Sequence, residues 1–173
     1  MFFVLKMSPN KSNLSYLLDE QINSLLNEAS SPYFSLKGRA SITFNEFLSD
    51  RMLLISVIKA GIPYKLFELI QNITPFSEFD WAKYLNISAK SLQRYKAANN
   101  FHFKSIHSEK ILEMAEVTQY GLQVFGQLEK FNLWLNTPNF ALANYKPIDL
   151  LSDSYGKELV ITELSHINQG IFS

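Results

Sequence analysis

The sequence predicts a mostly α-helical protein, and three observations support this fold class. Apolar residues recur at three- and four-residue spacing through most of the chain, as they do on the buried side of a helix. Capping residues, glycines and prolines separate these segments as helix start and stop signals. The alternation of apolar and polar residues that is typical of strands is nearly absent, except in residues 34–44.

Length and composition fit a globular protein with one domain or two small ones. The chain has 173 residues, of which 47% are hydrophobic, and no apolar run approaches the roughly 18 residues that a membrane span needs. The apolar residues 1–5 are too few for a secretory signal, and the first charge, Lys6, follows them instead of preceding them. No cysteine is present, which excludes disulfides and zinc–thiolate sites. We therefore expect a cytoplasmic protein with no membrane partner.

The first forty residues contain one recognisable helix. Leucine and isoleucine recur at helical spacing in residues 12–27, which predicts an amphipathic helix there. Serine, proline and glycine in residues 30–41 predict an irregular stretch. We treat residues 1–40 as an N-terminal extension whose role the pattern does not indicate.

The helices become better defined from Thr43 onward. Thr43 and Glu46 have the spacing of a capping box, which predicts a helix running to Ala60. Gly61 can take the left-handed conformation that ends a helix, and Pro63 suits the first position of the next. That next helix is expected at residues 64–72, before the Thr-Pro pair at 74–75. Further helices are expected at about residues 77–85, 88–98, 108–118, 121–136 and 156–169.

Residues 78–95 have the pattern of a helix-turn-helix. The crossing of two helices needs a small residue, and Ala82 is at that position. Asn86, four positions later, tolerates the left-handed conformation of the turn, and Ser88 can cap the second helix. The apolar residues that would hold both helices to the core are Trp81, Leu85, Ile87, Leu92 and Tyr95.

If this motif reads DNA, its second helix enters the major groove with its N-terminal half facing the bases. Residues 81–108 contain five basic residues and no acid: Lys83, Lys90, Arg94, Lys96 and Lys104. Gln93 suits adenine, Arg94 suits guanine or a phosphate, and the lysines suit phosphates. The DNA-binding candidates are Lys83, Ser88, Ala89, Lys90, Ser91, Gln93, Arg94 and Lys96. The alternative is a helix pair whose outer face is merely polar.

The residues from Val124 onward contain several short motifs. They read Val124-Phe125-Gly126, Trp134-Leu135-Asn136-Thr137-Pro138-Asn139, Pro147-Ile148-Asp149-Leu150-Leu151, Gly156 and Gly170-Ile171-Phe172. In physical terms, a helix ends at the Thr-Pro-Asn turn and a second turn at Lys146-Pro147 starts a short helix. Asp153 or Ser154 can cap the last helix, and its inward stripe is expected to be Val160, Leu164 and Ile167.

This arrangement resembles the toxin-binding domain of Xre-type antitoxins of the MbcA/ParS group, whose partners are RES-domain toxins. The stretch Ile58-Lys59-Ala60-Gly61-Ile62-Pro63 is also similar to the joint before the family's helix-turn-helix, so the resemblance covers about residues 50–173. It departs at residues 142–145, where the family usually has a glycine-rich turn. The resemblance implies a helix-turn-helix helical bundle at residues 41–118 and a small α-helical toxin-binding domain at residues 119–173.

The resemblance implies the antitoxin of a type II toxin–antitoxin pair. Such proteins bind and block a toxin that degrades NAD, occlude its active-site pocket with their C-terminal end and dimerise, and many repress their own operon by binding DNA. Carried over by position, the toxin-binding candidates are Lys157, Glu158, Ile161, Glu163, Ser165, Asn168, Gln169, Gly170, Ile171 and Phe172. The acidic balance of residues 148–173, four acids against one lysine, would suit a basic cleft. Alternatively, Ile171 and Phe172 fold back into the core of the chain itself.

Little in the sequence favours catalysis. His102 and His107 are five positions apart and so lie off a common helix face, and Gly121 and Gly126 form no phosphate-binding loop. We therefore predict no catalytic residue, no metal and no cofactor. The expected partners are a RES-domain toxin, operator DNA and a second copy of the chain. Two alternatives stay open: a free-standing helix-turn-helix transcriptional regulator, and a protein-interaction module whose helix-turn-helix does not touch DNA.

Overall fold

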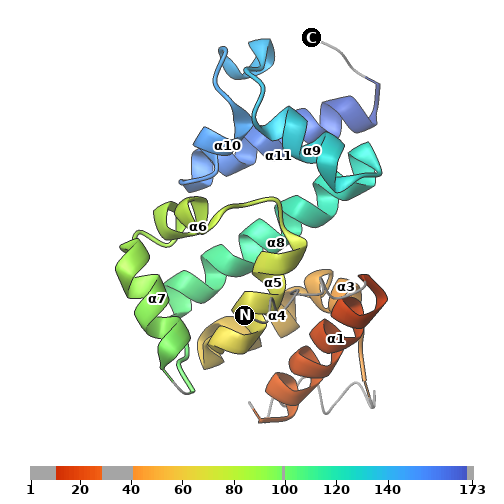
Figure 1. The fold of residues 1–173 in the computed structure, drawn as a ribbon. Helices are drawn as coiled ribbons and strands as arrows, with labels where there is room; N and C mark the ends of the chain where they lie inside the picture. The colour runs from red at the N-terminus through yellow and green to blue at the C-terminus, as the bar shows by residue number, and fades with distance from the viewer. Residues whose placement is uncertain (1–10, 29–40, 99, 171–173) are drawn as a thin grey trace, which may run out of the picture. The chain divides into compact units, whose positions relative to one another are not determined.

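The computed structural model describes residues 11–28, 41–98 and 100–170, which are built from helices (Figure 1). In chain order these are α1 (Lys11–Glu28), α3 (Phe44–Leu48), α4 (Arg51–Ala60), α5 (Tyr64–Ile73), α6 (Glu78–Tyr84), α7 (Ala89–Ala97), α8 (Ser105–Phe125), α9 (Leu128–Leu135), the 3₁₀ helix η1 (Phe140–Leu142), α10 (Pro147–Leu150) and α11 (Ser154–Asn168). The described ranges contain no strand, and their strand-like pairing is limited to an isolated bridge between Pro63 and His102. The predicted mostly α class is confirmed.

Most of the strand-like stretch at residues 34–44 lies outside the described residues, and its last member, Phe44, begins α3. None of the helices in the described part of the chain is both long and apolar enough to span a membrane.

The chain forms two compact units, residues 1–60 and residues 61–173. The described part of the first unit consists of α1, α3 and α4, and the second contains α5 to α11. The expected functional division at residues 40 and 118 follows other boundaries: the first lies inside the first unit, and the second lies inside α8. That division by function stays a prediction.

In the first unit, polar side chains of α1 hold the start of α3. The helix predicted at residues 12–27 is confirmed as α1, and its buried residues include Leu14, Leu18, Ile22 and Leu25. The Asn23 side chain pairs with the backbone of Ile42: its Nδ2 donates to the carbonyl at 2.8 Å, and its Oδ1 accepts from the amide at 2.9 Å. Asp19 accepts from the Phe44 amide at 2.6 Å. These bonds compensate for backbone groups that would otherwise lack partners.

The single helix expected from Thr43 to Ala60 is wrong, because the structure divides it into α3 and α4. The capping box itself is confirmed: Thr43 Oγ1 accepts from the Glu46 amide at 3.2 Å, and the Glu46 carboxylate accepts from the Thr43 amide at 2.8 Å. The break follows from Asp50, whose Oδ1 accepts from the Met52 amide at 3.1 Å and so caps a new helix. An aspartate side chain competes with the backbone for amide donors and interrupts a helix in this way.

The second unit begins at a joint that is fixed by hydrogen bonds. Gly61 has a φ of 86°, as expected for a left-handed residue, and Pro63 is the N-cap of α5 rather than its first residue. The Ile62 amide donates to Ser108 Oγ at 2.9 Å, and its carbonyl accepts from the Phe103 amide at 2.8 Å. The joint is thereby tied to the segment that leads into α8.

The helices expected at residues 108–118 and 121–136 are wrong in their boundaries. Helix α8 continues through Gly121 and ends at Gly126, which has a φ of 71°. Gly121 is buried, and a Cβ there would overlap the ring of Phe131 in α9. The glycine therefore marks a close contact between two helices and not a helix end.

Candidate functional site

The α6–α7 pair has the local features that the sequence predicts for residues 78–95. Ala82 is buried where the two helices meet, and Asn86 has a φ of 52° in the turn between them. Ser88 Oγ accepts from the Ser91 amide at 3.0 Å and caps α7. Of the residues expected to hold the pair in place, Trp81, Leu85 and Leu92 are buried, and Ile87 and Tyr95 are half-buried.

The core beneath this pair is largely aromatic. The ring centroids of Phe67 and Trp81 lie 5.1 Å apart, as do those of Phe67 and Phe103, both in edge-on arrangements. Such contacts fix the orientation of the rings as well as burying them. Helix α7 therefore packs on a well-ordered aromatic core, and its opposite side faces outward.

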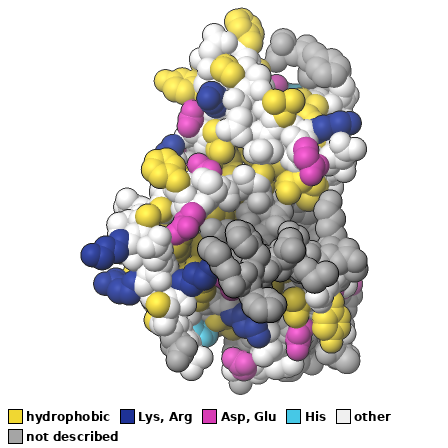
Figure 2. Space-filling view, viewed as in Figure 1, with side chains coloured by type: hydrophobic (Ala, Val, Ile, Leu, Met, Phe, Trp, Pro, Cys, Tyr) yellow, Lys and Arg dark blue, Asp and Glu magenta, His cyan; other side chains and the backbone are white. Residues whose placement is uncertain are grey.

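The residues predicted to bind DNA lie in α7, at its N-cap (Ser88) and in α6 (Lys83), and most of them are exposed. Lys83, Ser88, Ala89, Lys90, Gln93, Arg94 and Lys96 are exposed, and Ser91 is half-buried. Figure 2 shows Lys and Arg side chains gathered over α7. No acid occurs in this helix. The surface is thus basic, although the formal net charge of the whole chain is zero.

Carboxylates already partner two of these lysines. Lys83 Nζ lies 3.8 Å from Asp149, and Lys96 Nζ lies 3.1 Å from Glu68. The hydrogen bond with Glu68 raises the pKa of Lys96. Within the described residues Lys90 and Arg94 form no ion pair, and their four-residue spacing places them on one side of α7. The cations available to a phosphate backbone are therefore Lys90 and Arg94 first.

The C-terminal helices form a second surface on the same unit. Asp153 caps α11 by accepting from the Gly156 amide at 2.8 Å, which decides between the two predicted caps. Val160 and Leu164 are buried as predicted, and Ile167 is half-buried. In the turn at residues 142–145, Ala143 and Asn144 have φ values of 54° and 63°. Non-glycine residues here adopt the conformation that usually favours glycine.

The predicted toxin-binding residues differ in their exposure to solvent. Glu158, Asn168, Gln169 and Gly170 are exposed, whereas Lys157, Ile161, Glu163 and Ser165 are half-buried. Ile171 and Phe172 lie outside the described residues. The sequence did not indicate two partners that hold α11: Glu113 of α8 pairs with Lys157 at 2.7 Å, and Asn139 Nδ2 donates to Glu163 Oε1 at 3.4 Å. Both partners are distant in the chain, so no local pattern could reveal them.

Glu113 is the most constrained carboxylate in this surface. It pairs with Lys110 at 2.8 Å as well as with Lys157, and only 15% of its side chain is exposed. Burial alone would raise its pKa, but the hydrogen bonds and charges of the two lysines outweigh burial and lower the pKa. Glu113 therefore stays ionised and fixes α11 to α8.

The α6–α7 pair and the C-terminal helices are joined directly. The Tyr84 hydroxyl, in α6, donates to the Ile148 carbonyl of α10 at 3.2 Å, next to the pair between Lys83 and Asp149. Burial first, and then the charges of Asp80 and Asp149, strongly raise the pKa of Tyr84. The Tyr84 hydroxyl therefore stays protonated at neutral pH and can donate its hydrogen bond to Ile148.

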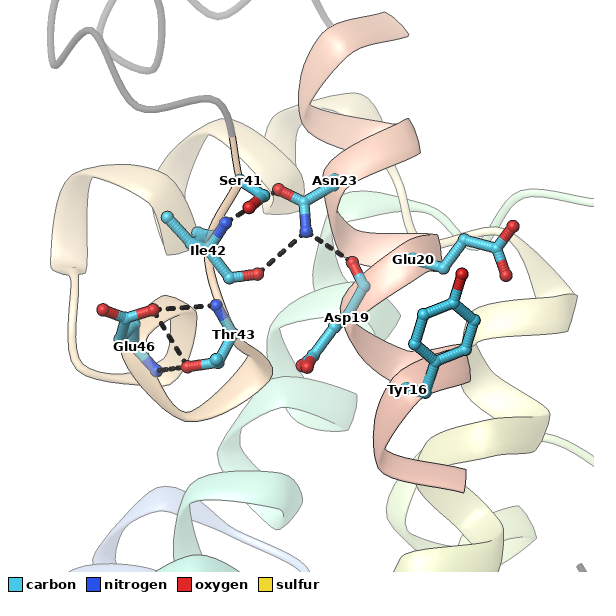
Figure 3. Close-up of a pocket in the computed structure, with 8 residues that line it drawn as sticks. All are labelled: Tyr16, Asp19, Glu20, Asn23, Ser41, Ile42, Thr43 and Glu46. Carbon is cyan, nitrogen blue, oxygen red and sulfur yellow. Dashed lines mark hydrogen bonds between the residues drawn. The ribbon is translucent and has the colours of Figure 1, made fainter. Parts of the chain in front are cut away.

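A pocket of about 520 Å³ lies in the first unit (Figure 3). It is lined by Tyr16, Asp19, Glu20, Asn23, Ser41, Ile42, Thr43 and Glu46. The amide of Asn23 and the carboxylates of Asp19 and Glu46 already bond to the backbone of residues 42–44. These groups hold the fold, and no cluster of three metal-ligating side chains occurs in the described ranges.

Comparison with known proteins bears on the second surface. Residues 121–170 match the antitoxin Xre/MbcA/ParS C-terminal toxin-binding domain. The chain is also 24% identical over 119 residues to a protein named antitoxin Xre from Photorhabdus laumondii, and this match covers 68% of the chain and 80% of that protein. These similarities support an antitoxin of a toxin–antitoxin system and suggest a regulatory role rather than an enzymatic one.

Proposed function

We propose that this chain is the antitoxin of a type II pair, which binds and blocks a RES-type toxin that degrades NAD and represses its own operon through α7. One observation carries the proposal: residues 121–170 match a toxin-binding domain, and they form the helical surface from the end of α8 to α11. The proposed complex forms in the cytoplasm and needs no cofactor.

The toxin-binding part of the proposal rests on α11 and the residues that follow it. Glu158, Asn168 and Gln169 are exposed and available for contacts. The last helix leads to Ile171 and Phe172, which we propose enter and occlude the toxin's pocket. The acidic side chains near this end would complement a basic nucleotide-binding cleft, since opposite charges at an interface favour encounter and correct orientation.

Co-expression with the neighbouring reading frame tests this proposal. We expect the neighbour's product to stop growth and deplete cellular NAD when expressed alone, and to be harmless and to co-purify when this chain is present. A variant that ends at Gly170 should still bind but should no longer restore growth. Growth restored by that variant would contradict occlusion by the tail. A harmless neighbour that does not co-purify would favour a free-standing regulator instead.

The DNA-binding part of the proposal rests on Lys90 and Arg94. The double substitution Lys90→Ala, Arg94→Ala should weaken binding to a fragment from upstream of the gene and make its salt dependence shallower by about two units of slope, since each lost phosphate contact removes about 0.9. The control is Lys130→Ala, an exposed lysine of α9. Equal binding by all three proteins would favour a protein-interaction module.

Dimerisation follows from the same proposal, because a helix-turn-helix dimer reads two half-sites about 34 Å apart, one turn of DNA. Light scattering on the purified chain measures this directly. We expect twice the chain mass of 19.9 kDa.

A further inference from the structure

Helix α11 carries an exposed apolar stripe that the predicted toxin-binding residues do not include. Tyr155 is 82% exposed and Leu159 is 55% exposed. These two residues are four positions apart and so share one side of the helix, and Glu163, a predicted toxin-binding residue, follows them on that side. Glu163 itself is half-buried and accepts a hydrogen bond from Asn139 Nδ2.

Asn139 joins α11 to the η1 turn. Its backbone N–H donates to the Tyr145 carbonyl at 3.1 Å, and Phe140 follows it in the chain. Phe140 is 81% exposed and Tyr145 is 59% exposed, so this turn, whose η1 helix contacts α11, carries two more large exposed side chains. We refer to Tyr155, Leu159, Phe140 and Tyr145 as the aromatic ridge.

Two features of the aromatic ridge are energetically unfavourable in the isolated chain. The turn that carries Phe140 and Tyr145 contains Ala143 in the left-handed conformation, which is strained for alanine, and Asn144 in the same conformation, which asparagine tolerates better. More than half of each of these four residues stays exposed and gains nothing from burial within the unit. Exposed apolar side chains that share one side of a helix, as Tyr155 and Leu159 do, mark interaction sites, and aromatic residues supply much of the binding energy at protein interfaces.

The charges around the ridge indicate the chemistry of its partner. Asp153 and Glu158 are exposed on α11, while the charge of Lys157 is already matched by Glu113. Residues 139–170 contain one other lysine, Lys146, and four acidic residues. Acidic side chains therefore outnumber basic ones in this part of the chain. A complementary surface has an apolar groove bordered by lysine or arginine.

We propose that the aromatic ridge is a second docking face for the toxin, which presents such a groove to it. This inference rests on the proposed antitoxin function and extends it to exposed apolar side chains that are not among the predicted toxin-binding residues. Ile161, a predicted toxin-binding residue, lies about 200° around the helix from Leu159, because each residue turns the helix by about 100°. The toxin therefore contacts two sides of the C-terminal segment, the ridge and the tail.

Substitution of the ridge separates this inference from the antitoxin function. The variants are Tyr155→Ser with Leu159→Ser, and Phe140→Ser; the control is Ile106→Ser in α8, which is 70% exposed and outside the matched segment. Calorimetry measures the affinity of each for the purified product of the neighbouring reading frame. We expect both ridge variants to bind at least about tenfold more weakly, which is about 1.4 kcal/mol, and the control to bind like the wild type. Circular dichroism should show the same helical content throughout.

Three other results would overturn the inference in different ways. If the wild type binds and both ridge variants bind equally well, the ridge is not a docking face, while the antitoxin function stands. If the wild type itself does not bind, the antitoxin function fails and the ridge proposal fails with it. If sedimentation shows that the ridge substitutions convert a wild-type dimer to a monomer with unchanged toxin affinity, the occupant of the ridge is a second copy of the chain.

Discussion

Replacing Gly156 by alanine tests how closely α10 and α11 pack. Gly156 is buried in the first turn of α11, and a Cβ built there would overlap the carbonyl of Leu150 at the end of α10. The obstacle is backbone, which cannot turn aside as a flexible side chain can. The substitution therefore requires α11 to move relative to α10 and shifts Tyr155 and Leu159 with it.

Two opposing effects set the expected magnitude. In an open helix, replacing glycine by alanine stabilises the protein by about 0.5–1 kcal/mol, because glycine loses more conformational freedom on folding. Forcing an extra methyl group into a packed site costs typically about 1–3 kcal/mol. The cost of the clash exceeds the gain in helix propensity, so we expect the free energy of unfolding of the second unit to fall by about 1–2 kcal/mol.

Tryptophan fluorescence during urea unfolding measures this change in the relevant unit. The chain has two tryptophans, Trp81 and Trp134, and both belong to the second unit. The control is Gly126→Ala, which has no atom within 4 Å of its Cβ and loses stability through its positive φ alone. Only the Gly156 variant should also weaken toxin binding. A raised unfolding midpoint for Gly156→Ala, as helix propensity alone predicts, would refute the close packing of α10 on α11.

Two further predictions use the same unfolding assay. Asn86→Val should lower the free energy of unfolding by about 1–2 kcal/mol and Asn86→Gly should not, because Asn86 has a φ of 52° that a β-branched residue tolerates poorly; equal stability of the two variants would contradict the turn geometry. The lowered pKa of Glu113 means that its stabilisation is complete above the ordinary carboxyl pKa of 4.5 and is lost as the pH falls through the lower pKa of the folded state, so Glu113→Gln should cost about 1–3 kcal/mol at neutral pH and flatten the acid side of the stability curve. An unchanged acid side in the glutamine variant would show that Glu113 is not its source.

The sequence predicted those parts of the fold that depend on neighbouring residues. The capping box at Thr43, the left-handed residues Gly61 and Asn86, and the cap at Ser88 each involve groups within a few positions of one another. The break at Asp50 is also local, but the apolar periodicity of residues 43–60 concealed it. The sequence could not predict that α8 continues through Gly121, because the reason for this glycine is the ring of Phe131 in another helix.

The same limit applies to the candidate site. Local spacing correctly placed Lys90 and Arg94 on an exposed side of α7. It could not show that Lys83 and Lys96 face carboxylates from distant segments, or that Lys157 is held by Glu113. These pairs reduce the charge that is free for a partner. The exposed apolar residues of the ridge were missed because periodicity identifies the buried side of a helix and says little about the other sides.

The proposed toxin-binding surface depends on residues outside the segment that matches the toxin-binding domain. The match begins at residue 121, in the last part of α8, whereas α11 is held by Glu113 further upstream and α10 is held by Tyr84 in α6. Removing the α6–α7 pair would leave the Ile148 carbonyl without its partner, and removing the C-terminal helices would uncover the side of α8 on which they pack. Deletion would therefore damage both proposed activities together. Substitutions on the two surfaces, at Lys90 and Arg94 on one and at Tyr155 and Leu159 on the other, can separate DNA binding from toxin binding within one folded unit.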